Sequence, residues 1–154
     1  MDKKPTVRVE IDPAYTESKI IIQADEKTEL IGQIEQAVER CIKGATTRVK
    51  GKRGDSVVLL DQQDIIRVYT ENRRLIICTD EGNCEARNTL RELEEILDPG
   101  LFVRISRFEL VNLNRVADFD FSAAGTIEVR FDNGSSTWVA RRYVREIQQT
   151  LNKL

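Results

Sequence analysis

The stretch that decides the fold reads Phe102-Val103-Arg104-Ile105-Ser106-Arg107-Phe108-Glu109-Leu110-Val111-Asn112-Leu113. Phe102–Ile105 and Leu110–Leu113 are short apolar runs, and runs of this length predict β-strands. Arg104 alternates with apolar neighbours inside the first run, so we expect it to form a structural ion pair. Asn112 is expected to be a buried or turn amide that bonds backbone groups.

More short strands are predicted on both sides of this stretch. The same pattern recurs at Val57–Leu60, Ile65–Tyr69, Leu75–Thr79, Ile127–Phe131 and Ser136–Val139. The polar residues 70–74 and residues 80–83 predict turns between the early strands. Asn133-Gly134 predicts a hairpin with a type I′ turn, because this pair accepts the positive φ that the turn requires. The part of the chain after residue 55 is therefore expected to be mostly β, with Phe102, Phe119, Phe121 and Trp138 in its core.

Two helices are predicted within this β-rich part. Thr89 and Glu92 have the spacing of a capping box, in which each side chain bonds the backbone at the other residue. The helix that they begin should end at Asp98-Pro99-Gly100. A last helix is predicted near Arg141 to Leu151, with its apolar residues on one side.

The first 47 residues predict a small α+β domain. Val7, Val9 and Ile11 alternate with charged residues, which indicates a half-buried strand, and residues 19–23 offer a second strand. Apolar residues recur at helical spacing between Leu30 and Ile42, which predicts an amphipathic helix from about Lys27 to Lys43. Its stripe could pack on the two strands or on a second copy of the chain. The predicted class is thus α+β, with an N-terminal domain at residues 1–47 and a mostly β domain at residues 48–154.

The boundary region between these domains allows two interpretations. Residues 44–55 contain three glycines among polar and basic residues and few apolar side chains, which is typical of a linker. Thr47, Arg48 and Val49 could instead begin a strand, and the whole stretch could be a solvated hairpin.

The residue types that are missing exclude several kinds of chemistry. The chain has no histidine, which removes Ser-His and Cys-His catalysis and histidine metal ligands. Cys41, Cys78 and Cys84 form no C-x-x-C pair, so they are interpreted as reduced thiols. No glycine-rich phosphate loop or nucleophile elbow is present. We therefore expect no enzymatic activity, no cofactor and no metal.

Charge and hydropathy place the chain among ordinary globular proteins. The 154 residues carry a formal net charge of −2, and residues 46–154 hold as many acidic as basic side chains. Net charge therefore gives no support to nucleic acid binding, which would depend on arginines gathering on one face. No apolar run approaches the roughly 20 residues of a membrane span, and no signal core follows the N-terminus. A cytoplasmic protein without membrane insertion is expected.

The order of these motifs resembles the LytTR family of DNA-binding domains. Residues 102–113 look like the family's central Phe-x-Arg to Val-Asn motif, although Ser106 stands where the family usually has histidine. Upstream, Asp64-Ile65-Ile66 and Asn72-Arg73-Arg74-Leu75 are similar to its opening strand pair. Downstream, residues 131–134 and 139–144 resemble its closing hairpin and final motif. The resemblance covers about a hundred residues in the family's order.

The resemblance implies a bacterial, response-regulator-like transcription regulator that binds double-stranded DNA. LytTR domains read major-groove bases from loops of an elongated, mostly β fold, and Arg73, Arg107 and Arg142 match the positions used for base contacts. Arginine suits this role, because its planar fork can donate two hydrogen bonds to guanine. The residues expected to contact phosphates are Asn72, Arg74, Ser106, Arg141 and Arg145.

The resemblance also bears on assembly and on the alternatives. Family sites are paired direct repeats, so we expect a homodimer held by the N-terminal domain, which is too short for a receiver domain. Stand-alone relatives are often controlled by a membrane protein, which makes such a partner possible here. The competing hypothesis is a protein-interaction or sensory β module that does not bind DNA, consistent with the balanced charge and with Ser106. The two hypotheses differ in whether the three arginines share one edge of the domain.

Overall fold

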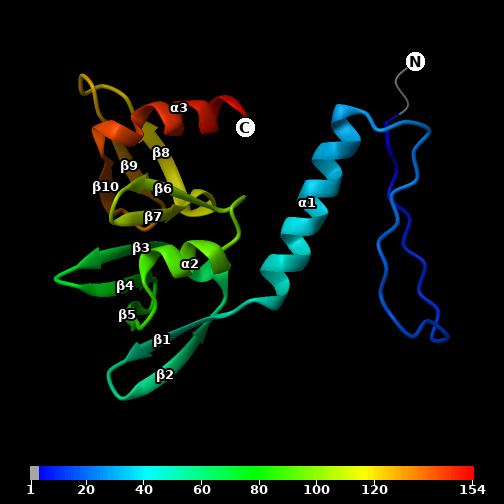
Figure 1. Ribbon diagram of the computed structural model, residues 1–154, viewed down its shortest axis with the longest axis horizontal. Helices are drawn as coiled ribbons and strands as arrows, with labels where there is room; N and C mark the ends of the chain where they lie inside the picture. Colours follow the sequence, from blue (N-terminus) through cyan, green and yellow to red (C-terminus); the bar gives the residue numbers. More distant parts are fainter. Residues whose placement is uncertain (1–3) are drawn as a thin grey trace. The chain divides into compact units, whose positions relative to one another are not determined.

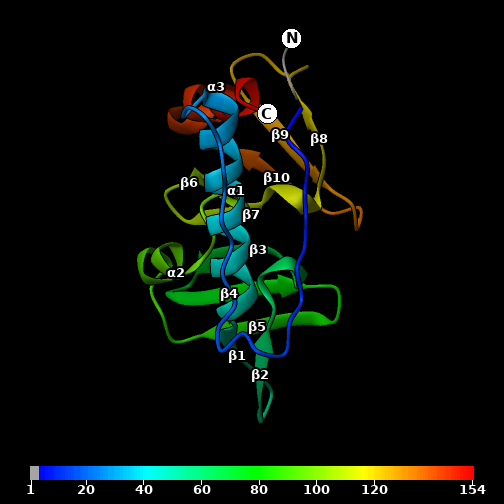
Figure 2. The same ribbon diagram turned by 90° about the vertical axis from the view of Figure 1, so that its right-hand side faces the viewer.

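The computed structural model describes residues 4–154, with the side chains of residues 43–46 left aside. It divides by its internal contacts into two units, residues 1–36 and residues 37–154, and the second holds all the strands. Figures 1 and 2 show how the strands of this second unit are arranged in two sheets. The predicted boundary between domains at residues 47 and 48 stays a prediction, and residues 1–3 of the first domain lie outside the described residues.

The larger sheet has seven antiparallel strands in the order β2-β1-β5-β4-β3-β7-β6. Its strands are β1 (Val49–Arg53), β2 (Ser56–Leu60), β3 (Ile65–Glu71), β4 (Arg74–Thr79), β5 (Gly82–Ala86), β6 (Phe102–Ser106) and β7 (Glu109–Asn112). The smaller sheet has the order β10-β9-β8, with β8 (Val116–Asp120), β9 (Ile127–Phe131) and β10 (Ser136–Val139). Both views show it beyond β6 and β7, on the side away from β1 and β2.

Strand β7 explains why the molecule has two cores. All four of its residues are buried, because successive side chains point to opposite faces of a strand and both faces are covered. Leu110 packs in the core beneath helix α2 (Leu90–Ile96), together with Leu75 and Leu93. Val111 packs in the other core, which the smaller sheet and helix α3 (Val144–Asn152) complete. The continuous apolar run at residues 110–111 is thus the sequence signature of a strand buried on both faces.

The predicted strands of the β domain and all three helices are confirmed. The capping box forms as predicted, since Thr89 Oγ1 accepts a hydrogen bond from Glu92 N and the Glu92 side chain accepts one from Thr89 N. Residues 44–55 are no linker: they contain β1, which pairs with β2 in a hairpin whose turn includes Gly54 at φ 58°. The mostly β fold is therefore confirmed, with β5 and β8 added to the predicted strands.

The N-terminal unit differs from the prediction. Helix α1 (Glu29–Thr46) is present, and Thr28 Oγ1 accepts a hydrogen bond from Ile31 N, which caps its start. Residues 4–28 contain neither of the two predicted strands. Val7, Ile11 and Ile20 are 94%, 90% and 63% exposed. The prediction of two half-buried strands is therefore wrong: a lone pair of strands with no layer to cover its apolar face is marginal in water.

The Asn133-Gly134 hairpin also forms, with a different turn. Phe131 N donates to Ser135 O over 2.8 Å, so three residues lie in the loop, and of the predicted pair Gly134 alone has a positive φ, 86°. The prediction of a type I′ turn there is wrong. The Asn-Gly pair is equally compatible with a three-residue hairpin loop that has glycine in the left-handed region.

Candidate nucleic-acid interface

The turn between β3 and β4 is a two-residue loop made without glycine. Glu71 pairs with Arg74 in the strand register, which leaves Asn72 and Arg73 in the loop. Their φ angles are 49° and 63°, as a type I′ turn requires at both central positions. Asparagine tolerates this left-handed region, whereas arginine carries a cost of about 1–2 kcal/mol there. An exposed arginine at a position that favours glycine suggests a functional role for its side chain.

The turn between β6 and β7 is held in place by two side chains from β6. Ser106 pairs with Glu109 in register, so Arg107 and Phe108 form the loop. Ser106 Oγ accepts a hydrogen bond from Phe108 N over 3.1 Å, and Arg104 Nη1 donates to Arg107 O over 2.8 Å. Arg104 is also ion-paired with Glu94, which confirms its predicted structural role. Ser106 and Arg104 together fix the direction in which the Arg107 side chain leaves the sheet.

These two turns lie side by side at one edge of the larger sheet. Strands β3 and β7 are antiparallel neighbours with Tyr69 opposite Glu109, so the end of β3 meets the start of β7. One step further out, Thr70 N donates to Phe108 O over 2.9 Å and joins the bases of the two turns. Figure 1 shows both turns on its left-hand side.

The segment that follows β10 reaches the same edge. Ala140 N donates to Ile105 O over 2.9 Å, which attaches the start of the short helix η3 (Arg141–Tyr143) to β6 beside Ser106. Arg141 and Arg142 follow immediately, and Arg145 lies in the first turn of α3; all three are exposed. In Figure 1 the stretch between β10 and α3 is on the same side as the two turns.

Comparison with known proteins assigns the chain to a family. The family model described as the LytTr DNA-binding domain matches residues 55–152, which is more than half of the chain. The chain belongs to the LytTR family. Residues 55–152 therefore form a DNA-binding domain of this family, and the resemblance found in the sequence is confirmed.

Relatives and a solved structure agree with the LytTR assignment. The chain is 27% identical over 139 residues to the sensory transduction protein LytT of Enterococcus faecalis, covering 89% of this chain and 57% of that protein. It is 27% identical over 142 residues to an uncharacterized HTH-type transcriptional regulator of Staphylococcus aureus, covering 92% of this chain and 95% of that protein. A LytTr DNA-binding domain from Bacillus cereus superposes with a TM-score of 0.66 at 20% identity, covering 69% of this chain and 97% of that one, which shows the fold.

The LytTR architecture here differs from what "HTH-type" in the staphylococcal name describes. Helix-turn-helix proteins insert the second of two consecutive helices into the major groove. Among residues 4–154, α2 and α3 are separated by β6 to β10, and no helix-turn-helix is formed. No helix in the same range is long and apolar enough to cross a bilayer.

The arginines of this LytTR domain fall into two groups that occupy different places. One group forms ion pairs with neighbouring carboxylates: Arg48, Arg53, Arg67, Arg74, Arg104, Arg115 and Arg130. The other group has no ion pair with any residue that the structure describes: Arg73, Arg87, Arg91, Arg107, Arg141, Arg142 and Arg145. The second group lies in the two turns, at the end of β5 and the start of α2, and around η3. A chain with a balanced net charge therefore still places several arginines without an ion pair at one edge of the larger sheet.

The predicted site residues all lie at this edge, in three short segments. Asn72, Arg73 and Arg74 come from the β3–β4 turn, Ser106 and Arg107 from the β6–β7 turn, and Arg141, Arg142 and Arg145 from η3 and the start of α3. Arg74 differs from the others because its guanidinium is bonded to Glu85 over 3.2 Å. The assignment of these residues to bases or phosphates stays a prediction.

The sequence did not reveal the role of Phe108 and placed two other aromatic residues wrongly. Phe108 is exposed at the tip of its turn, with the Arg107 guanidinium 5.7 Å from its ring centre. Trp138 and Phe121 were expected in the core but are 52% and 49% exposed, whereas Phe102 and Phe119 pack in the two cores. Trp138 alternates with the buried Val139 and therefore faces outward from β10. Once Val139 is assigned to the core, the two-residue period of a strand places Trp138 on the opposite, exposed face.

Proposed function

We propose that this chain is a transcription regulator that binds specific DNA sequences through arginines carried by turns, and that it acts by binding and not by catalysis. The observation that carries the proposal is the shared edge of the two neighbouring turns and η3, where the uncompensated arginines gather. The family model, described as a DNA-binding domain, favours this proposal over the alternative of a β module that binds no DNA.

Base readout would come from Arg73, Arg107 and Arg142. The β3–β4 and β6–β7 turns are about 10 Å apart, two strand spacings, which fits inside a major groove about 12 Å wide. Each arginine that bonds guanine O6 and N7 would contribute about 1–3 kcal/mol of discrimination against other bases. Arg104 and Ser106 support this role, because a turn held by side-chain hydrogen bonds loses less freedom when it enters the groove.

Phosphate contacts would position the domain on the duplex. Asn72, Arg141 and Arg145 flank the three base-reading candidates and are exposed. Ser106 can donate its hydroxyl hydrogen to a phosphate while its oxygen accepts from Phe108 N. Arg74 would have to share its guanidinium between Glu85 and a phosphate. These contacts set register and orientation without reading sequence.

We further propose that the chain binds paired repeats as a homodimer through its N-terminal unit. Support comes from the exposed alternating side chains Val7, Val9 and Ile11, and from the amphipathic helix α1. Apolar stripes of this kind that remain in water mark surfaces for protein partners. A second copy carries the same stripe and can cover it by a symmetric contact.

The proposed DNA binding is tested by selecting genomic fragments with the purified full-length protein at low and at physiological salt. We expect enrichment of paired direct repeats that weakens as salt rises. The variant Arg107→Ala, Arg142→Ala should lose the enrichment. The control variant Arg130→Ala, Lys153→Ala removes two cations that lie away from this edge and should keep it. If the wild-type protein enriches no sequence at low salt, the proposal is wrong.

A further inference from the structure

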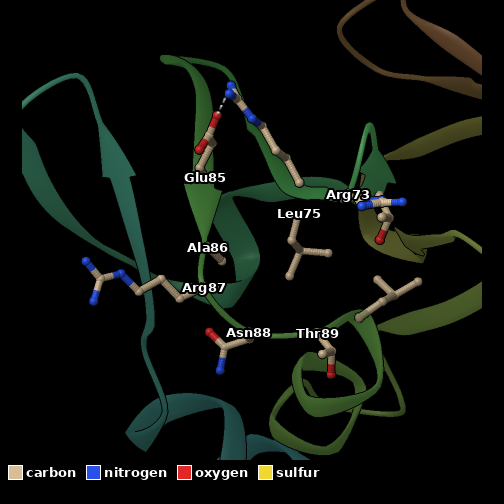
Figure 3. A pocket seen from close by; sticks show the side chains of 10 residues that line it. Arg73, Leu75, Glu85, Ala86, Arg87, Asn88 and Thr89 are labelled. Atoms are coloured by element: carbon tan, nitrogen blue, oxygen red, sulfur yellow. Dashed lines mark hydrogen bonds and ion pairs between the residues drawn. The ribbon is translucent and has the colours of Figure 1, made fainter.

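A pocket beside the β3–β4 turn lies at the same edge; it shares Arg73 and Arg74 with the proposed contacts, and its other lining residues belong to none of them. Its volume is about 400 Å³, and it is lined by residues of the β3–β4 turn and by the chain that leads from β5 into α2. Leu75 pairs with Ala86 in register, so the end of β5 reaches the edge where the turn begins. Figure 3 shows Leu75 and Ala86 on its floor.

The pocket combines an apolar floor with a basic rim. Leu75 and Leu90 are nearly buried, and with Ala86 they leave a small apolar surface at the bottom. Arg73, Arg74 and Arg87 stand around it with the amide of Asn88. Arg74 is neutralised by Glu85, whereas Arg73 and Arg87 have no ion pair among residues 4–154.

The positions of these arginines favour an extended ligand over a small anion. Figure 3 shows the guanidinium groups of Arg73 and Arg87 on opposite sides of the pocket, with Leu75 and Ala86 between them. A single phosphate or carboxylate is held by donors that converge on it, which these two side chains do not do. A nucleic acid strand presents one charge per about 3.4 Å of helix axis, with apolar sugar faces between the phosphates.

The strand order places Arg87 beyond the β3–β4 turn, on the side away from the β6–β7 turn. Three and a half strand spacings, about 17 Å, separate β5 from the turn between β6 and β7. This exceeds the width of a major groove, about 12 Å. When the two turns occupy the groove, Arg87 reaches the backbone that borders it.

We propose that this pocket binds the sugar–phosphate backbone of DNA beside the bases that the turns read, with Arg87 as its phosphate ligand and Leu75, Ala86 and Leu90 against a deoxyribose. The inference rests on the proposed DNA binding and adds to it a contact on the far side of the β3–β4 turn. Arg87 therefore contributes affinity but no sequence preference.

The experiment measures affinity of the full-length protein for a selected operator and for a scrambled duplex, each at several salt concentrations. For Arg87→Ala we expect about a tenfold loss on both duplexes. The slope of log K against log salt should become shallower by about 0.9, the value for one phosphate contact. Arg87→Lys should retain the slope. Lys153→Ala removes one cation at the other end of α3 and should change neither quantity.

Three results overturn the inference while leaving the proposed function intact. An unchanged salt slope for Arg87→Ala means that no phosphate contact is lost. A loss confined to the operator means that Arg87 reads a base. The third result comes from adding inorganic phosphate at constant ionic strength. If phosphate raises the melting temperature of the wild-type protein but not that of Arg87→Ala, the pocket is a small-anion site instead. Failure of the wild-type protein to bind either duplex contradicts the proposed function itself.

Discussion

At the scale of single residues, Glu109 links the turn that carries Arg107 to the smaller sheet. Its Oε1 accepts hydrogen bonds from Arg67 Nη1 over 3.2 Å and from Thr137 Oγ1 over 3.1 Å. Its Oε2 is buried and has no hydrogen-bond partner among the described residues. Burial raises the pKa of Glu109 above its ordinary value of 4.5, and the opposing effects of Arg67 and Thr137 do not reverse this.

The raised pKa of Glu109 predicts a pH dependence of stability. A carboxyl group whose folded pKa lies above its unfolded value stabilises the fold fully below pH 4.5, and this stabilisation is lost as pH rises through the folded pKa. Glu109→Gln cannot ionise. The free energy of unfolding of the wild-type protein, relative to that of Glu109→Gln, should therefore fall as pH rises from 4 towards 7. Urea denaturation at a series of pH values measures it, and a difference that stays constant or grows would contradict the assignment.

Asn112 shows what sequence could predict about a single residue. An asparagine inside an apolar run was expected to bond backbone groups, and it is fully buried, donating to Ile65 O over 2.8 Å and accepting from Asn114 N over 3.0 Å. The prediction succeeded because a buried amide must be satisfied and the nearest partners are always backbone groups. The hydrogen bond from Thr137 to Glu109 could not be predicted, since Thr137 is 28 residues away and on the other sheet.

At the scale of elements, runs of apolar or β-branched residues decided which strands could be predicted. Strands β3, β4, β6, β7 and β9 carry apolar runs and were found, whereas β5 (Gly-Asn-Cys-Glu-Ala) and β8 (Val-Ala-Asp-Phe-Asp) were not. Strand β5 buries only Cys84, and the β8 carboxylates Asp118 and Asp120 pair with Arg130 across the sheet. Strands stabilised by backbone pairing and exposed ion pairs leave little periodicity in the sequence.

Turn type illustrates the same limit. Asn133-Gly134 carries the strongest type I′ signal in the chain, yet the type I′ turn forms at Asn72-Arg73. Strand register fixes a two-residue loop between β3 and β4, and arginine accepts the left-handed conformation because pairing on both sides imposes it. Sequence could place Arg73 in a turn, but it could not reveal the strain.

That strain predicts a trade between stability and binding at Arg73. Arg73→Gly removes a side chain from a left-handed position and should raise the free energy of unfolding by about 0.5–1 kcal/mol, after the entropy of glycine in the unfolded chain is subtracted. The same change should lower operator affinity about tenfold or more, because a base contact is lost. Chemical denaturation and fluorescence anisotropy measure the two effects. Arg73→Ala is the matched control: it should lose affinity without gaining stability. A glycine variant that binds as tightly as the wild type would remove Arg73 from the interface.

At the scale of the whole molecule, the structure differs most from the sequence-based prediction in the N-terminal unit. Both cores of the β domain are made of residues between Val49 and Leu151. Residues 4–28 have an equally regular apolar alternation but no core of their own. Local periodicity predicts a strand whether or not a partner strand or layer exists to cover it, which is why the sequence pattern failed here.

A second copy of the chain as that partner leads to a prediction about operators with two repeats. Binding of one DNA-binding domain would hold the other near its own repeat, so the dimer should bind paired repeats about 10² to 10⁴ times more tightly than a single repeat. Val9→Asp, Ile11→Asp places charges on the exposed alternating apolar side chains, and should give a monomer that binds one repeat normally and loses this advantage. Thr6→Asp, Ser18→Asp adds the same charge at exposed polar positions and should remain dimeric. Light scattering at micromolar concentration, combined with titration of one-repeat and two-repeat duplexes, distinguishes the variants. If the wild-type protein is monomeric in this range and gains no affinity from the second repeat, the dimer proposal is wrong. The N-terminal unit would then bind a different partner, and each LytTR domain would bind DNA alone.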